Sequence, residues 1–303
     1  MRIANGHFST TIQSALSRGN AQLGDLMTQM AKGERLVRPS DDPIASVRLR
    51  MLERDSVMLK QYRSNVSALG IRLQQNETQL DGMLGSVMSA KDMLLWALDG
   101  ANTPEDLNAM STSLRTLRDT LLASANARNS EGHYLFSGTA TSTAPIAYDP
   151  AQPVGARYSF VGNTNQQQVV VGNGITQAGN VSVENLAEVL NQMDSALALM
   201  ESPGVRINDP AVRATLAAAE RALNDGIGSI SGKIAQLGGA QNTLRVLDDS
   251  HAAGQVSNGE AQQRVGGLDV VATYDQLTRH TVAIQATYKV YGQIMQLNPF
   301  QLL

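Results

Sequence analysis

The sequence contains no cysteine, so neither disulfide bonds nor thiolate metal sites can stabilise it. Aromatic residues make up only 4% of its 303 positions, which disfavours a deep, aromatic-lined ligand pocket. The 24 basic residues are scattered and the net charge is -3, so the clusters of Lys and Arg that nucleic-acid binding requires are missing. Nucleic acid is therefore not an expected partner, and the packing of aliphatic side chains must hold the chain together.

Long hydrophobic runs are missing as well. The longest, Met93 to Leu98, is far too short to cross a bilayer, and the amino terminus lacks the hydrophobic stretch of a secretory signal. We therefore expect no membrane insertion. If the chain leaves the cell, we expect it to do so without a cleaved signal peptide.

Nothing in the sequence suggests catalysis. The segment from Gly226 to Ile234 imitates a phosphate-binding loop, but Ile227 and Ile234 stand where that motif needs Gly and Ser or Thr. The histidines are too dispersed for metal-ligand spacing; they are His7, His133, His251 and His280. We therefore predict a protein that is not an enzyme and that has no catalytic residues, cofactor or metal.

Hydrophobic residues recur at spacings of three and four, which predicts long amphipathic helices. The first tract is a heptad seam that ends at Gly33, and the last tract repeats the pattern near the carboxyl terminus. Both seams are predicted assembly interfaces. Their residues are Ile12, Leu16, Leu23, Leu26 and Met30 in the first tract, and Val270, Tyr274, Leu277, Ile284, Tyr288, Tyr291 and Met295 in the last.

Further helices are predicted between the two seams. One begins at Thr103, where Pro104 fits the first helical position and Asp106 can complete a capping box. Others run from Leu186 to Met200 and behind an Asp209–Pro210 cap. The longest carries one stripe, formed by Ile44, Val47, Met51, Met58, Tyr62, Leu69, Leu73, Leu80, Met83, Val87 and Leu94.

Asn65 and Asn76 continue the spacing of this stripe. A buried Asn would fix the register of the helices at a cost in stability. Alternatively, both residues lie on the solvated edge of the stripe.

The amino-acid composition changes at Gly132, where Gly, Pro, Thr and Asn become frequent and short runs of β-branched residues appear. The predicted fold is mainly α: an elongated multi-helix bundle with paired N- and C-terminal coiled-coil helices and a small β insert. The predicted domains are terminal helices at 1–40 and 266–303, a long-helix core at 41–131 and 181–265, and a β-rich surface domain at 132–180.

The segment KGERLVRPSDDPIAS, Lys32 to Ser46, interrupts the helical pattern. Pro39 excludes the helical conformation from the residue before it, and Asp42 can cap a new helix whose first residue is Pro43. Asp41 and Asp42 would also lie at the positive end of the new helix dipole. We interpret the segment as a hinge or cap between two helices.

Four stretches together resemble the flagellin family. They are MRI at the start, the segment from Lys32 to Ser46, EGHYLFSGT at Glu131 to Thr139, and a final heptad helix that ends in FQLL. They follow the family's order along the whole chain. Pro43 after the paired aspartates resembles the hook-associated branch, because filament flagellins more often have alanine there.

The resemblance implies a structural subunit of the extracellular flagellum that joins a hook-associated layer to the flagellin filament. Its terminal helices would pair in the inner tube, its long helices would form the next layer, and the segment from Lys32 to Ser46 would be the hinge between them. The implied partners are neighbouring copies, a hook-associated protein on the hook side, flagellin on the filament side and an export chaperone of the flagellar type III apparatus.

Several alternatives remain open. A short filament flagellin would polymerise on its own, whereas a secreted helical translocator, another binding module or an enzyme would be a different class of protein. A terminal helix with one hydrophobic stripe must offset about 1–2 kcal/mol of backbone entropy per residue. We therefore expect both ends to order fully only when neighbouring subunits cover their seams.

Overall fold

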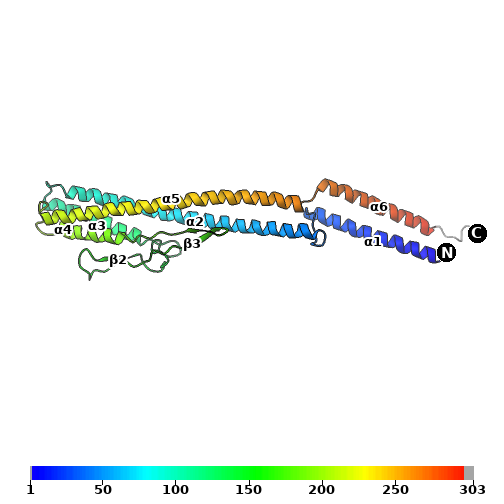
Figure 1. Ribbon diagram of the computed structural model, residues 1–303, viewed down its shortest axis with the longest axis horizontal. Coiled ribbons are helices and arrows are strands. Elements are labelled where there is room, and N and C mark those ends of the chain that lie inside the picture. Colours follow the sequence, from blue (N-terminus) through cyan, green and yellow to red (C-terminus); the bar gives the residue numbers. More distant parts are fainter. Residues whose placement is uncertain (1, 297–303) are drawn as a thin grey trace, which may run out of the picture. The chain divides into compact units, whose positions relative to one another are not determined.

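The structure is a computed structural model that describes residues 2–296, without the side chains of residues 2–6, 8 and 294–296. The initial Met1 and the terminal FQLL lie outside the described residues. Helices dominate the described part (Figure 1). Their bounds are α1 (Arg2–Lys32), α2 (Pro43–Ala97), α3 (Pro104–Ala125), α4 (Leu186–Met200), α5 (Pro210–Gly266) and α6 (Val270–Gln296). The prediction of a mainly α fold with a small β insert is confirmed.

The chain divides into two compact units. Unit 1 comprises residues 1–60 and 252–303, and unit 2 comprises residues 61–251. The long helices α2 and α5 contribute residues to both units. The three-part division expected from the sequence stays a prediction.

Unit 2 is a helical bundle with a heptad core. Along α2 the buried positions are Val66, Leu69, Leu73, Asn76, Leu80, Met83, Val87, Ala90, Leu94 and Ala97, at alternating spacings of three and four. The facing part of α5 buries Leu216, Leu223, Ile230, Leu237 and Leu244, among others. Each fully buried Leu contributes about 1.5–3 kcal/mol relative to an exposed one. This burial gives unit 2 a closed hydrophobic core.

Two shorter helices complete the bundle of unit 2. The Thr103 side chain accepts a hydrogen bond from the Asp106 N–H, and the Asp106 carboxylate accepts one from the Thr103 N–H, so the predicted capping box is present. Helix α4 packs against α3. It also approaches α5 closely at Gly226, because glycine has no side chain; a Cβ there would lie 2.8 Å from Val189 Cγ2. The Asp209 carboxylate accepts a hydrogen bond from the Ala211 N–H, which confirms that cap too.

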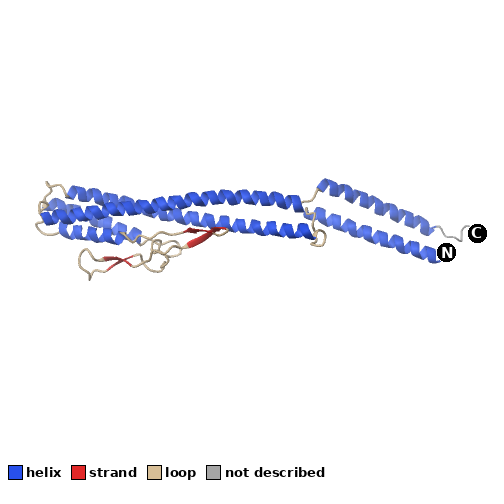
Figure 2. Cartoon of the chain, in the orientation of Figure 1, coloured by secondary structure: helices blue, strands red, loops and turns tan. Residues whose placement is uncertain are grey.

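The β insert consists of two antiparallel hairpins (Figure 2). Strands β1 (Ile146–Tyr148) and β2 (Tyr158–Phe160) form the first, and β3 (Gln168–Gly172) and β4 (Ile175–Ala178) form the second. Asn65 Nδ2 donates to the Val170 carbonyl over 2.8 Å, and His251 Nε2 lies 2.8 Å from the Val171 carbonyl. These contacts attach the β3–β4 hairpin to α2 and α5.

The structure separates the two asparagines of the predicted stripe. Asn65 is half-buried and hydrogen-bonded, whereas the side chain of Asn76 is completely buried in the heptad core. Neither amide atom of Asn76 has a hydrogen-bond partner among the described residues. The solvated-edge interpretation is therefore wrong for Asn76, which occupies a core position that a hydrophobic side chain would fill.

Candidate assembly interface

The terminal helices α1 and α6 of unit 1 lie side by side and antiparallel (Figure 1). Ser9 Oγ lies 3.3 Å from Tyr291 Oη, and Asn20 Nδ2 donates to Tyr288 Oη over 3.4 Å. A Cβ at Gly19 would lie 3.2 Å from Ile284, so this glycine permits the close approach of the two helices. The pair is thus held by a narrow line of contacts.

Neither terminal helix is well covered. Among the described side chains of α1 none is buried, and Ile12, Leu16, Leu23, Leu26 and Met30 are all only half-buried. In α6 only Thr273 is buried among the described side chains. The same heptad pattern that reaches complete burial in unit 2 therefore remains open here, because two helices cover only one side of each seam.

The predicted interface residues of α6 fall into two groups. Leu277, Ile284 and Tyr291 are half-buried. Val270, Tyr274 and Tyr288 are 57%, 61% and 52% exposed, respectively. The side chain of Met295 lies outside the described residues. A groove of ≈ 470 Å³ beside Tyr288 and Tyr291 is lined on α1 by Ile12 and Leu16, among others.

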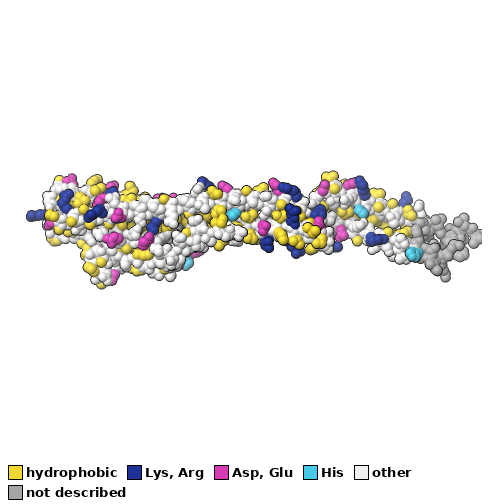
Figure 3. All heavy atoms as spheres, in the orientation of Figure 1, with side chains coloured by type: hydrophobic (Ala, Val, Ile, Leu, Met, Phe, Trp, Pro, Cys, Tyr) yellow, Lys and Arg dark blue, Asp and Glu magenta, His cyan; other side chains and the backbone are white. Residues whose placement is uncertain are grey.

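A second open surface follows the start of α2, where Ile44, Val47, Met51 and Met58 are 84%, 54%, 53% and 40% exposed. We call these four residues the outer seam. The inner side of this segment faces α5 instead: Leu49 lies next to Gly266, and Leu59 lies next to Gly254. Figure 3 shows hydrophobic side chains exposed among basic ones over this part of unit 1. The prediction of one continuous stripe from Ile44 to Leu94 is wrong here, because the row of α2 that contains Leu49 and Leu59 packs on α5 instead.

The residues between α1 and α2 form an ordered elbow. Helix α1 ends at Lys32, and Gly33 follows with φ +69, a left-handed conformation that favours glycine. Asp42 Oδ1 accepts the Ala45 N–H over 3.0 Å, as predicted for an N-cap. The backbone N–H of Ala45 is the main cause that lowers the pKa of Asp42 below its usual value, and Arg35 adds to it.

Asp41 has a different role from the expected one at the helix dipole. Its Oδ2 accepts the backbone N–H groups of Val37 and Arg38 over 3.2 and 2.8 Å. The Asp41 N–H in turn donates to the Arg38 carbonyl over 3.0 Å, which closes a tight turn through Pro39. Asp41 therefore fixes the elbow rather than the start of α2.

Arg35 is the elbow residue that sequence reasoning missed. Its N–H donates to the Gly266 carbonyl over 2.9 Å, and its guanidinium donates to the Val265 carbonyl over 3.0 Å. Both carbonyls belong to the end of α5. A second break follows there, because Gly267 precedes an N-cap at Asp269, whose carboxylate accepts the Ala272 N–H. The sequence GGLD, Gly266 to Asp269, could have predicted this second break.

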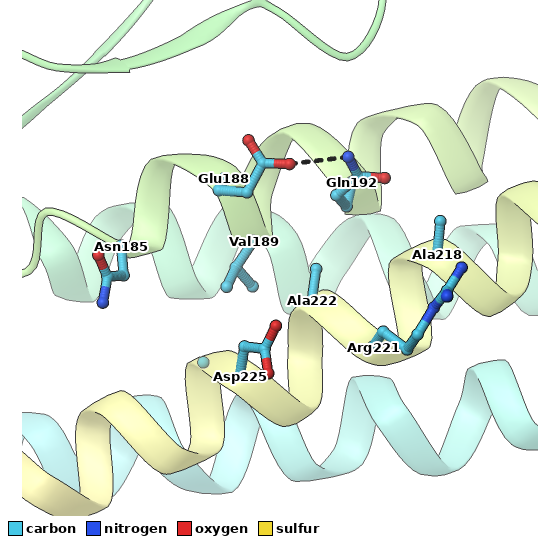
Figure 4. A pocket seen from close by; sticks show the side chains of 9 residues that line it. Asn185, Glu188, Val189, Gln192, Ala218, Arg221, Ala222 and Asp225 are labelled. Atoms are coloured by element: carbon cyan, nitrogen blue, oxygen red, sulfur yellow. Dashed lines mark hydrogen bonds between the residues drawn. The ribbon is translucent and has the colours of Figure 1, made fainter.

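The described surface also carries a pocket on unit 2. In a pocket of ≈ 490 Å³ between α4 and α5, Val189 and Ala222 face each other, whereas Glu188 and Gln192 point away from Asp225 (Figure 4). The described residues contain no group of three or more His, Asp or Glu side chains that could hold a metal ion. No helix among them is long and hydrophobic enough to span a membrane.

Open heptad surfaces joined to a closed bundle define a class of protein: a subunit that assembles through its helices. A family model described as the bacterial flagellin N-terminal helical region matches residues 3–141. Flagellar hook-associated protein 3 of Escherichia coli is 27% identical over 292 residues, which cover 90% of each chain. The protein of the same name from Salmonella typhimurium is 25% identical over 323 residues, covering 100% of this chain and 99% of that one.

Solved structures agree with these relatives. A flagellar hook-associated protein of Vibrio parahaemolyticus is 33% identical, with a TM-score of 0.67, over 75% of this chain and all (100%) of that chain. Flagellar hook-associated protein 3 of Legionella pneumophila shares the fold at 12% identity and a TM-score of 0.63, over 71% of this chain and 98% of that one. The chain belongs to the flagellar hook-associated proteins. It is a structural component of the bacterial flagellum, and the resemblance seen in the sequence is confirmed.

Proposed function

We propose that this chain is the adaptor that joins the hook-associated layer to the flagellin filament. The observation that carries the proposal is the outer seam, four hydrophobic side chains at heptad spacing that are between 40% and 84% exposed. Exposed hydrophobic stripes of this kind are typical of protein–protein interfaces. A flagellar junction protein of Legionella pneumophila has the same fold, which supports this location.

In this proposal the terminal helices form the inner tube and the remaining helices pack around it. The half-buried seams of α1 and α6 become buried against neighbouring copies, and the outer seam packs against an adjacent subunit. The elbow, with Pro39, Asp41, Asp42 and Pro43, sets the direction in which α2 leaves the inner tube. We include in the proposal that the chain reaches this place through the flagellar type III apparatus with an export chaperone.

The test is complementation of a strain that lacks this protein, with filaments counted by electron microscopy. Met51→Glu places a charge on the outer seam and is expected to abolish filaments while leaving unit 2 folded. Val246→Glu is the matched control, since Val246 is 59% exposed on α5 outside the seam. Equal numbers of filaments in both variants would contradict the role of the outer seam.

A second measurement separates an adaptor from a short filament flagellin. The purified chain is incubated with fragments of flagellar filament as seeds and inspected for elongation. An adaptor is expected to add a limited tier to the seed ends and then stop. Long filaments made of this chain alone would overturn the adaptor proposal in favour of a flagellin.

A further inference from the structure

Unit 2 contains a polar pocket of ≈ 580 Å³ between α2 and the loop that follows α3. Arg72 and Ile71 line it from α2, and Glu131 and His133 line it from the loop. Hydrogen bonds hold the loop that forms one wall of the pocket. Asn129 Oδ1 accepts the N–H groups of Glu131 and His133 over 3.0 and 2.9 Å, which fixes the loop.

Arg72 is the unusual group in this pocket. It is half-buried, and its guanidinium donates to Gln167 Oε1 over 2.5 Å. Gln167 is itself held, because its Nε2 donates to the Gly138 carbonyl over 2.8 Å. Burial is the main effect on Arg72 and lowers its pKa, which the charge of Glu131 opposes. No carboxylate among the described residues forms an ion pair with Arg72, although a guanidinium has five N–H donors.

Glu131 acts on Arg72 through its charge but forms no ion pair with it. Glu131 lies 3.5 Å from His133 Nδ1, and its side chain is 73% exposed. Arg128, on the same loop, stacks 4.3 Å over the ring of Tyr134 and adds positive charge nearby. The pocket therefore presents a partly desolvated cation with one neutral partner. A carboxylate is the ligand that matches a guanidinium best, because it accepts two parallel N–H bonds.

The opposite flank of α2 offers such a carboxylate. Asp81 lies nine residues after Arg72, which at about 100° and 1.5 Å per residue places it about 180° around the helix and about 13 Å along it. Asp81 is exposed, and no ion pair joins it to another of the described residues. A cation on one flank and an anion on the other are complementary surfaces that permit head-to-tail association, in which each copy uses two different surfaces.

We propose that the Arg72 pocket binds Asp81 of a neighbouring copy of this chain, so that copies join head to tail around the tier. The exposed Ile71, at 59%, would pack against the partner beside this ion pair. The inference rests on the proposed assembly function and adds to it a specific contact and a polarity. Because every copy contributes both groups, the contact can repeat from one copy to the next.

The first test is a charge exchange in the complementation assay. Arg72→Glu and Asp81→Arg are each expected to abolish filaments, and the double variant is expected to restore them. The double variant of Arg72→Glu with Asp92→Arg is the matched control, since Asp92 is also exposed on that flank. Restoration by Asp92→Arg, or none by Asp81→Arg, would overturn the assignment. Circular dichroism checks that the variants fold. If Arg72→Glu does not fold, Arg72→Gln and Asp81→Asn are tested singly and together, and the double variant is expected to lose no more filaments than either single variant.

The second test uses the absence of cysteine. Gln75→Cys, beside the pocket, is combined with Gly85→Cys, one turn from Asp81, and flagella are treated with a short bismaleimide. A ladder of this chain's multimers is expected with both cysteines present, and neither Gln75→Cys alone nor Gly85→Cys alone should give one. Dimers with Gln75→Cys alone would indicate two-fold contacts, and products with another flagellar protein would indicate a different occupant; either overturns the inference. If the unmodified chain fails to restore filaments, the proposed function itself is wrong.

Discussion

Asp194 provides the sharpest prediction on stability. Its side chain is 4% exposed and lies 3.1 Å from Arg118 Nη1 and 3.5 Å from Arg157 Nη1. Its Oδ2 also accepts the Gly155 N–H over 3.4 Å, so one carboxylate ties α3 and the loop before β2 to α4. Arg118 is itself only 16% exposed. Replacing Asp194 by Ala would leave this guanidinium buried without its innermost partner.

Breaking a buried ion pair by removing one partner costs about 3–5 kcal/mol. For a unit of the size of residues 61–251, each kcal/mol lowers the Tm by about 2–4 °C. Asp194→Ala is therefore expected to lower the Tm of unit 2 by about 6–20 °C. The assay is unfolding followed by far-UV circular dichroism, in guanidinium chloride and on heating.

Asp119 is the matched control, because it pairs with the same Arg118 at 2.8 Å but is 59% exposed. Exposed pairs contribute about 0–1 kcal/mol, so Asp119→Ala should change stability little. The double variant with Arg118→Ala and Asp194→Ala should cost less than the sum of its parts, since both act on one interaction. If Asp194→Ala and Asp119→Ala cost the same, burial does not control the strength of this network and the reasoning is refuted.

Further predictions concern the core, the elbow and acid. Asn76→Leu should raise the free energy of unfolding of unit 2 by about 1–3 kcal/mol, because it removes an unsatisfied amide, whereas Asn65→Leu should lower it by breaking the bond to the hairpin. A loss of stability in Asn76→Leu would contradict this. Gly33→Ala should destabilise the elbow by about 1–2 kcal/mol, seen as faster hydrogen exchange there, while Gly24→Ala, inside α1, should slow exchange. If Gly33→Ala slowed hydrogen exchange and Gly24→Ala accelerated it, the positive φ of Gly33 could not be the reason for glycine at this position. The folded-state pKa of Asp42 is lowered, so its contribution is present above the ordinary value of 3.8 and is lost as the pH falls below it. Exchange at the start of α2 should therefore rise in acid relative to Asp42→Asn, and an equal response of both proteins would refute the cap.

Much of the architecture could be predicted because local chemistry determines it. The caps at Thr103 and Asp209 and the turn at Gly33 depend on neighbouring residues only, and the structure shows all three. The packing of the stripe from Ile44 could not be predicted, because α2 carries several hydrophobic rows and their spacing does not show which row packs on α5. Arg35 was missed for a similar reason: its partners lie at the end of α5, far away in the sequence.

The central claim is that unit 1 has open seams that assembly closes, while unit 2 is complete by itself. Limited proteolysis of the purified monomer, with fragment masses read by mass spectrometry, tests it most directly. The account predicts that α1 and α6 are trimmed to a resistant core that begins near Arg38 and ends before about Thr273, and that the same bonds resist cleavage in intact flagella. Terminal helices that resist the protease as firmly as unit 2 in the free monomer would contradict the account.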